Sequence, residues 1–268
     1  LFMGDNGENG ASVEAIFPIL QDGLKTTSYG TTLYLMAGSN DNSEHIKSAT
    51  VAGNNTTGGW AGNRMRPDLV LKFFPNNDAP NVAAYAMPAA ADDDRALFDG
   101  DGRTVSNGDD EKGVKVFTNG FSVCKFNNFK TDGSAGHNSL FPDADFFLMR
   151  AAEAYLMYAE ADARQNNGTT TAQGTAYINA LRTRANATTQ TAYSLRQICD
   201  EWSREFYFEG LRRTTLIRFG YFGGNVNYNW SWKGGVKSGR NFDSHLNLFP
   251  IPTSDMVANS NLIQNSGY

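Results

Sequence analysis

Two groups of carboxylates could supply acid and base chemistry. Glu201 and Glu205 are four residues apart, which places them on one face of a helix, and Asp92 to Asp94 are consecutive. A pair of carboxylates can hydrolyse a glycosidic bond through an oxocarbenium-like transition state. However, the segment that carries the two glutamates is also rich in arginine. We therefore interpret Glu201 and Glu205 as a salt-bridged helix surface, and a glycosidase is the alternative class.

The segment Asp99-Gly100-Asp101-Gly102 begins like the calcium loop of an EF-hand. In that motif the fifth position carries an oxygen ligand and the sixth is glycine, whereas this chain has Arg103 and Thr104 there. The surrounding stretch, residues 75–113, is acidic and broken by proline and glycine. We therefore reject a calcium-binding hand and predict a solvated acidic loop.

Trp60 is a candidate binding residue because glycines surround it in the segment 53–63. An indole exposed in a flexible loop wastes apolar surface unless a ligand stacks on it. The alternative is that the indole folds back as a hydrophobic plug. Trp230 and Trp232, which alternate with small polar residues, leave a similar choice, and there we favour a strand packed against the helices over a sugar-binding face.

Sustained helical periodicity occurs only between Phe141 and Phe222. The first predicted helix begins near Phe146, and Ser194 opens a later one with a capping box. Two helix hairpins in succession suggest tetratricopeptide-like packing, although their spacing misses the period of about 34 residues of that repeat. The expected helices are 146 to the break at Asn167-Gly168, 172–187, 194 to a cap at Gly210, and a short one through 216–219.

Outside that block the chain is rich in glycine, asparagine and aspartate, and only short elements are expected. Val13 to Leu20 contains a proline and predicts an edge strand or an extended run. Pro67 to Phe74 predicts a short helix. Residues 114–129 alternate around Asn119-Gly120 and predict a β-hairpin, whereas residues 21–64 predict a long loop. The fold class is therefore mostly α, with tetratricopeptide-like hairpins, long irregular loops and short β-strands.

Composition excludes some classes of function. The net charge of -5 and pI near 5.2 provide no basic patch for nucleic acid. No apolar run approaches the length of about 18 residues that a transmembrane helix needs. Leu1 does not open a signal peptide, so we expect the later part of a longer precursor. Cys124 and Cys199 lie in apolar patterns and are expected to be buried free thiols.

Four motifs, in order, resemble the SusD/RagB family, and the likeness is closest to its starch-binding member. They are Asp143 to Leu156, Glu201 to Arg213, Phe249-Pro250-Ile251-Pro252 and Gln264 to Tyr268. The likeness extends back through Trp60 to Met3. The chain is therefore expected to be the C-terminal part of a SusD-like domain, with a loop-rich glycan-binding region at about 1–140, a helical platform at 141–222 and an aromatic loop and tail at 223–268.

The resemblance implies a surface-exposed outer-membrane lipoprotein that binds glycan without cleaving it and acts as a lid on a TonB-dependent transporter of the SusC type. Its lipid anchor would lie outside this chain. Tyr29 and Trp60 match two members of the aromatic arc that binds starch-type α-glucan in the family. Pyranose rings have an apolar face that can stack on such rings while the hydroxyls stay hydrated. Other glycans are the alternative ligands. A scaffold that binds only protein would leave the region from Tyr29 to Trp60 without a role.

The same resemblance implies a structural calcium ion, bound by paired aspartates that match Asp143 and Asp145. Two carboxylates separated by one residue in a loop can converge on one hard cation. A third ligand of the family falls in the polar loop Asp5-Asn6-Gly7-Glu8, and there we favour Asp5. The alternative is that Asp143 and Asp145 cap the following helix and compensate its dipole.

Overall fold

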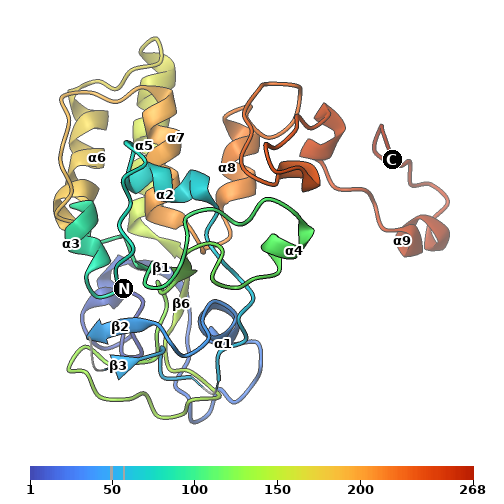
Figure 1. Ribbon diagram of the computed structural model, residues 1–268. Helices are drawn as coiled ribbons and strands as arrows, with labels where there is room; N and C mark the ends of the chain where they lie inside the picture. The colour runs from blue at the N-terminus through green and yellow to red at the C-terminus, as the bar shows by residue number, and fades with distance from the viewer. Residues whose placement is uncertain (49–50, 57) are drawn as a thin grey trace. The chain divides into compact units, whose positions relative to one another are not determined.

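The computed structural model describes residues 1–48, 51–56 and 58–268, which form two compact units, Leu1–Glu209 and Gly210–Tyr268 (Figure 1). The first unit holds the longer helices and the strands, and the second holds short helices in irregular chain. This confirms the mostly α fold with long loops and short strands. None of the helices in the described part of the chain is long and apolar enough to cross a membrane.

The helices and strands of the first unit are short except for three helices near its end. In chain order they are η1 Ala11–Glu14, β1 Ala15–Ile19, α1 Leu33–Ala37, β2 His45–Ser48, β3 Val51–Ala52, α2 Pro67–Phe73, α3 Met87–Ala91, β4 Phe98–Asp99, α4 Glu111–Val114, β5 Ser122–Val123, β6 Phe146–Arg150, α5 Ala151–Gln165, α6 Ala172–Arg184 and α7 Leu195–Phe206. The expected helix at Pro67 is α2, and the expected edge strand is β1. Both predictions are confirmed.

The three long helices α5, α6 and α7 lie side by side, with α5 in contact with both others (Figure 1). The side chain of Ser194 accepts a hydrogen bond from the backbone of Gln197, which confirms the predicted capping box of α7. Asn167 and Gly168 both have positive φ just after α5, as expected of a helix end. The cap predicted at Gly210 is wrong, because α7 ends at Phe206 and Tyr207 is already extended.

The first long helix begins later than predicted, because Phe146–Arg150 forms the strand β6. This strand pairs antiparallel with β1, so that Phe17 lies opposite Met149 and Pro18 opposite Phe147. A short apolar run of aromatic and aliphatic residues fits a strand as well as a helix, and pairing with β1 decides the outcome here. The prediction of a helix from Phe146 is therefore wrong over its first turn.

The β-hairpin predicted around Asn119-Gly120 is not formed. β5 pairs instead with β4, and the residues before the turn contain the short helix α4. Phe98 of β4 and Phe121 are fully buried, with stacked rings 5.9 Å apart. Burial of these two aromatic rings in the core outweighs the local turn signal, because apolar burial stabilises by more than a turn preference does.

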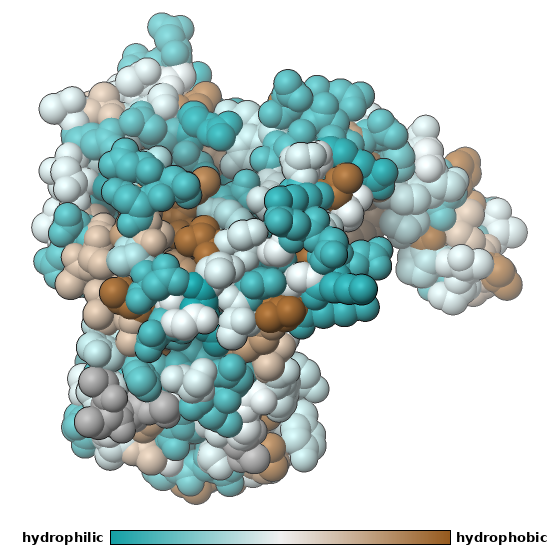
Figure 2. All heavy atoms as spheres, in the orientation of Figure 1, coloured by the Kyte–Doolittle hydropathy of each residue, from teal (hydrophilic) through white to brown (hydrophobic). Residues whose placement is uncertain are grey.

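The long loop predicted for residues 21–64 is interrupted by α1 and by the antiparallel pair β2–β3. Leu33, Met36 and Ala37 of α1 are buried, which is one stripe of a short amphipathic helix. Met36 packs in a small core with Phe126 and Ala144. On the face shown in Figure 2, hydrophilic side chains cover most of the surface and hydrophobic ones form small separate patches.

The second unit contains α8 Arg212–Arg218, η2 Lys233–Gly235, η3 Ser244–Asn247 and α9 Thr253–Ala258. Trp230 packs edge-to-face on Phe242 at 6.2 Å, and the ammonium of Lys233 lies 4.6 Å from the centre of a Trp230 ring. The strand expected at Trp230 and Trp232 is not formed, because a turn with positive φ at Trp232 leads directly into η2. Cys124 and Cys199 in the first unit are both buried and are not joined in a disulfide, as expected.

Candidate functional site

Glu201 and Glu205 are buried, and their carboxylates form ion pairs with arginines. Glu201 contacts Arg95 and Arg182, each at 2.7 Å. Burial opposes ionisation of Glu201, but Arg204, Arg95 and Arg182 outweigh it and lower its pKa to about 2. The predicted ion pairing is confirmed, but its place is buried rather than on the surface. Glutamates that stay ionised and enclosed by guanidinium groups are poorly suited to general acid–base catalysis.

The acidic segment around Asp93 and Asp99 is not the solvated loop predicted from composition. Asp93 is buried and pairs with Arg95 at 2.7 Å. Asp99 is buried in β4 and accepts a hydrogen bond from the backbone of Ala84, while burial raises its pKa to about 6. The neighbouring arginines, including Arg103, supply the positive charge that permits this burial.

Trp60 is exposed rather than folded back as a plug. Trp60 is 47% exposed and Tyr34 of α1 is 58% exposed. Their rings meet edge-to-face, with centroids 5.1 Å apart and an interplanar angle of 74°. Aromatic rings prefer this arrangement because the positive edge of one meets the negative face of the other. The structure thus presents two adjoining aromatic rings to solvent.

Tyr29 is 60% exposed and forms a different ring pair, with Phe141 at 5.7 Å. Phe141 lies two residues before Asp143, so Tyr29 rests on the chain that leads into the paired aspartates. Tyr34 and Phe141 are neighbours of the predicted rings that were not predicted from the sequence. The signal available for Tyr34 was its place beside the buried stripe Leu33, Met36 and Ala37, which marks it as the outward residue of a short helix.

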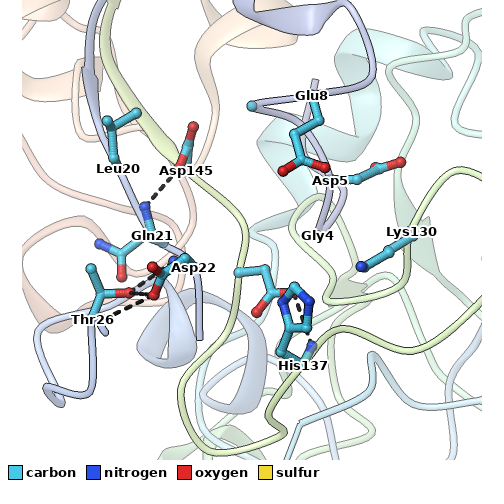
Figure 3. A pocket seen from close by; sticks show the side chains of 12 residues that line it. Gly4, Asp5, Glu8, Leu20, Gln21, Asp22, Thr26, Lys130, His137 and Asp145 are labelled. Atoms are coloured by element: carbon cyan, nitrogen blue, oxygen red, sulfur yellow. Dashed lines mark hydrogen bonds and ion pairs between the residues drawn. The ribbon is translucent and has the colours of Figure 1, made fainter. Parts of the chain in front are cut away.

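The three predicted metal ligands line one cavity of about 280 Å³ (Figure 3). Asp145 lies there beside Gln21, whose backbone donates a hydrogen bond of 2.7 Å to the Asp145 carboxylate. Asp143 accepts a hydrogen bond of 2.9 Å from the backbone of His137, and His137 Nδ1 lies 2.9 Å from the same carboxylate oxygen. The cavity is lined by Gly4, Asp5, Gly7, Glu8, Leu20, Gln21, Asp22, Thr26, Lys130, His137, Asp143 and Asp145.

Asp5 lines the cavity but its carboxylate is used elsewhere. It accepts from the backbone and the hydroxyl of Thr131, at 2.9 and 3.0 Å, and from the side chain of Asn9. In the view of Figure 3 this carboxylate is directed away from Asp145. The next residue, Asn6, instead ties the first loop to the aspartates, because its side chain exchanges two hydrogen bonds with the backbone of Asp145.

The side-chain oxygens of the cavity lining suit a hard cation that accepts neutral oxygen ligands as well as carboxylates. Within the described residues, Asp143 Oδ1 and Gln21 Oε1 are buried and accept no hydrogen bond. Burial and the charge of Glu8 raise the pKa of Asp145, because both disfavour the ionised carboxylate. No group of three His, Cys, Asp or Glu side chains converges in that part of the chain. Calcium would therefore need the amide oxygen, backbone carbonyls or water as well.

The alternative role of Asp143 and Asp145 as helix caps is wrong. The helix that follows them, α5, begins only at Ala151, and β6 separates it from both aspartates. Its N-cap residue is Arg150, in extended conformation and with no side-chain cap. The two aspartates are therefore held by the loops around the cavity.

The fold and these sites define a class of mostly helical proteins that present tyrosine and tryptophan rings on irregular chain. A sequence model described as the SusD family matches residues 99–268. The chain is also 39% identical over 300 aligned positions to the starch-binding protein SusD of Bacteroides thetaiotaomicron, covering 100% of this chain and 52% of that protein. The chain belongs to the SusD family, and it spans about half the length of this relative.

Solved structures show the same fold. A laminarin-binding SusD-like protein has a TM-score of 0.55 at 21% identity, covering 100% of this chain and 53% of its own. A SusD-like protein of Bacteroides fragilis has a TM-score of 0.61 at 18% identity, covering 100% and 56%. A SusD superfamily protein of Parabacteroides distasonis has a TM-score of 0.54 at 19% identity, covering 100% and 52%.

Proposed function

We propose that this chain is part of a non-catalytic glycan-binding protein that captures starch-type α-glucan by aromatic stacking. The observation that carries the proposal is that Tyr29 and Trp60 are each about half exposed while packed against a second aromatic ring. A supported ring can accept the apolar face of a sugar without first being ordered, so less entropy is lost on binding. Stacking at single rings is weak, and repetition along a polymer would raise the overall affinity.

The choice of α-glucan rests on the relative, not on the geometry. The starch-binding relative shares 39% identity over the whole of this chain. Because the laminarin-binding protein shares the fold at 21% identity, the fold itself is compatible with more than one glycan. A glycosidase is disfavoured because the glutamate pair at Glu201 and Glu205 is buried among arginines.

We also propose the cellular setting that the family resemblance implied. The protein would be a surface-exposed outer-membrane lipoprotein, anchored by lipid outside this chain, and would deliver glycan to a TonB-dependent transporter of the SusC type. Membership of the SusD family supports this setting. The acidic net charge of -5 agrees with the absence of nucleic acid from the proposed partners.

A structural calcium ion is proposed for the acidic cavity. Asp143 and Asp145 would hold it, and Asp5, our expected third ligand, would have to leave Thr131 to take part. Gln21 also lines the cavity, and its buried side-chain oxygen, which accepts no hydrogen bond from the described residues, would be a further ligand. The ion would neutralise carboxylates that line the same cavity, and this would tie residues 5–8 to residues 143–145.

The test is a titration of the full-length protein with maltoheptaose, followed by tryptophan fluorescence and by reducing-sugar release. We expect saturable quenching, loss of that quenching in Trp60→Ala, and no sugar release over a long incubation. Tyr158→Ala, which removes a tyrosine exposed on α5, is the matched control and should bind normally. Sugar release would support an enzyme instead. A response to laminari-oligosaccharide alone would replace the proposed ligand, and no response to either would contradict glycan binding.

A further inference from the structure

Trp60 is fixed to the end of α1 by its backbone as well as by its ring. The backbone amides of Trp60, Ala61, Gly62 and Asn63 donate hydrogen bonds of 2.6–3.2 Å to carbonyls of residues 37, 38 and 40. Helices leave their last carbonyls without intrahelical partners, so α1 offers a set of acceptors at this end. The loop of Trp60 donates to the carbonyls of Ala37, the last residue of α1, and of Gly38, its C-cap. We call this arrangement the α1 clamp.

The α1 clamp fixes the backbone of Trp60 but leaves its side chain able to choose among rotamers. Tyr34 lies on α1 about one turn before Ala37. Its ring contacts the indole of Trp60 and so limits the rotamers that Trp60 can adopt. Tyr34 is itself directed outward, because its neighbours Leu33 and Met36 are buried. The helix α1, the α1 clamp and the ring pair with Tyr34 therefore all restrain the indole of Trp60.

We propose that Tyr34 is a positioning residue that holds the indole of Trp60 in the orientation used for glycan stacking. This inference rests on the proposed function and adds a residue to that same site. An edge-to-face pair restrains its partner, and a restrained indole loses less rotational freedom when a sugar binds. Removing the Tyr34 ring should therefore weaken binding by about threefold to tenfold, because an aromatic pair contributes on that scale.

The experiment uses full-length protein labelled with 5-fluorotryptophan, in which the Trp60 resonance is assigned by its loss in Trp60→Phe. Tyr34→Ala removes the ring. Tyr34→Phe removes only the hydroxyl and should keep both the wild-type Trp60 resonance and the wild-type affinity. Tyr158→Ala is the matched control, because Tyr158 is 47% exposed and forms an edge-to-face pair with Tyr177 at 4.8 Å. Each variant is measured without ligand, then titrated with maltoheptaose, and its melting temperature is recorded.

We expect Tyr34→Ala to shift or broaden the Trp60 resonance without ligand and to lower the affinity, while Tyr34→Phe and Tyr158→Ala match the wild type in both. The melting temperature of Tyr34→Ala should stay close to that of Tyr158→Ala. An unchanged Trp60 resonance in Tyr34→Ala would overturn the positioning role, and so would an unchanged affinity. If wild-type protein gives no response to maltoheptaose, glycan binding fails, whereas the ligand-free spectra still decide whether Tyr34 orients the indole.

Discussion

The hydroxyl of Thr32 donates a hydrogen bond of 3.1 Å to the carbonyl oxygen of Ala144, and both residues are buried. Ala144 stands between the two aspartates of the acidic cavity, and Thr32 immediately precedes α1, the helix that carries Tyr34. One hydrogen bond thus joins the proposed cation site to the proposed glycan site. The contact of Tyr29 with Phe141 is a second connection between the same two regions.

Thr32→Val should lower the free energy of unfolding by about 1–3 kcal/mol, because the buried carbonyl of Ala144 loses its donor while the shape of the side chain is kept. Thr214→Val is the matched control, since the Thr214 hydroxyl is exposed and donates within its own helix turn. Urea denaturation of the three proteins measures the difference. If both variants lost the same free energy of unfolding, the hydrogen bond to Ala144 would contribute no more than the exposed one of Thr214.

Calcium should raise the melting temperature of the wild-type protein by roughly 5 °C or more at saturation, because a ligand that binds only the folded state stabilises it. The double variant Asp143→Asn with Asp145→Asn should lose this response. Asp132→Asn, at an exposed aspartate, should keep it. Through Thr32 and Phe141, calcium should also strengthen glycan binding in the wild type. A calcium response that survives in the double variant would place the ion elsewhere.

Gly59→Ala should weaken glycan binding by about tenfold, because the binding free energy lost with an oriented stacking ring corresponds to a change in affinity of that size. A methyl group there would stand 2.4 Å from the carbonyl oxygen of Asn40 and from the Cα of Asp41, so the α1 clamp must open. Gly30→Ala is the matched control, because the described atom nearest to its added methyl, apart from those of its chain neighbours, would be the hydroxyl oxygen of Ser28, at 3.6 Å. Isothermal titration with maltoheptaose compares them. Similar affinities would show that binding does not need the clamp.

The sequence predicts those features that depend on local signals. The capping box at Ser194 and the turn at Asn167-Gly168 are each encoded by a few neighbouring residues, and both are present. The exposure of Trp60 did not follow from its glycines alone, because it depends on hydrogen bonds to carbonyls of α1, more than 20 residues earlier. The strand β6 was missed for the same reason, since its partner β1 lies far away in the chain.

Burial of charge was the least predictable feature. Glu201 and Glu205 were expected on a salt-bridged helix surface because their segment is rich in arginine, and Asp93 and Asp99 were expected in a solvated loop. Each instead meets arginines, several of which come from distant segments. A buried ion pair is stable only when its partners converge with good geometry, and convergence of that kind is a property of the tertiary fold.

The arginine-bound glutamates should make the protein sensitive to acid. The unfolded state protonates Glu201 near its ordinary pKa of 4.5, whereas the folded state keeps it ionised down to about pH 2. Stability from this group is therefore present above pH 4.5 and falls as pH drops toward 2, by about 3 kcal/mol in total. Asp99 acts in the opposite direction between pH 6 and 4, because its folded pKa is raised to about 6.

We therefore expect the free energy of unfolding, measured in urea at pH 7, 4.5 and 3, to fall mainly between the last two values. Glu201→Gln should be less stable at pH 7, because three arginines lose a partner, but its stability should depend less on pH in the acid range. Glu111→Gln, at an exposed glutamate on α4, should follow the wild-type curve. A Glu201→Gln curve as steep as that of the wild type would mean that other carboxylates cause the acid unfolding.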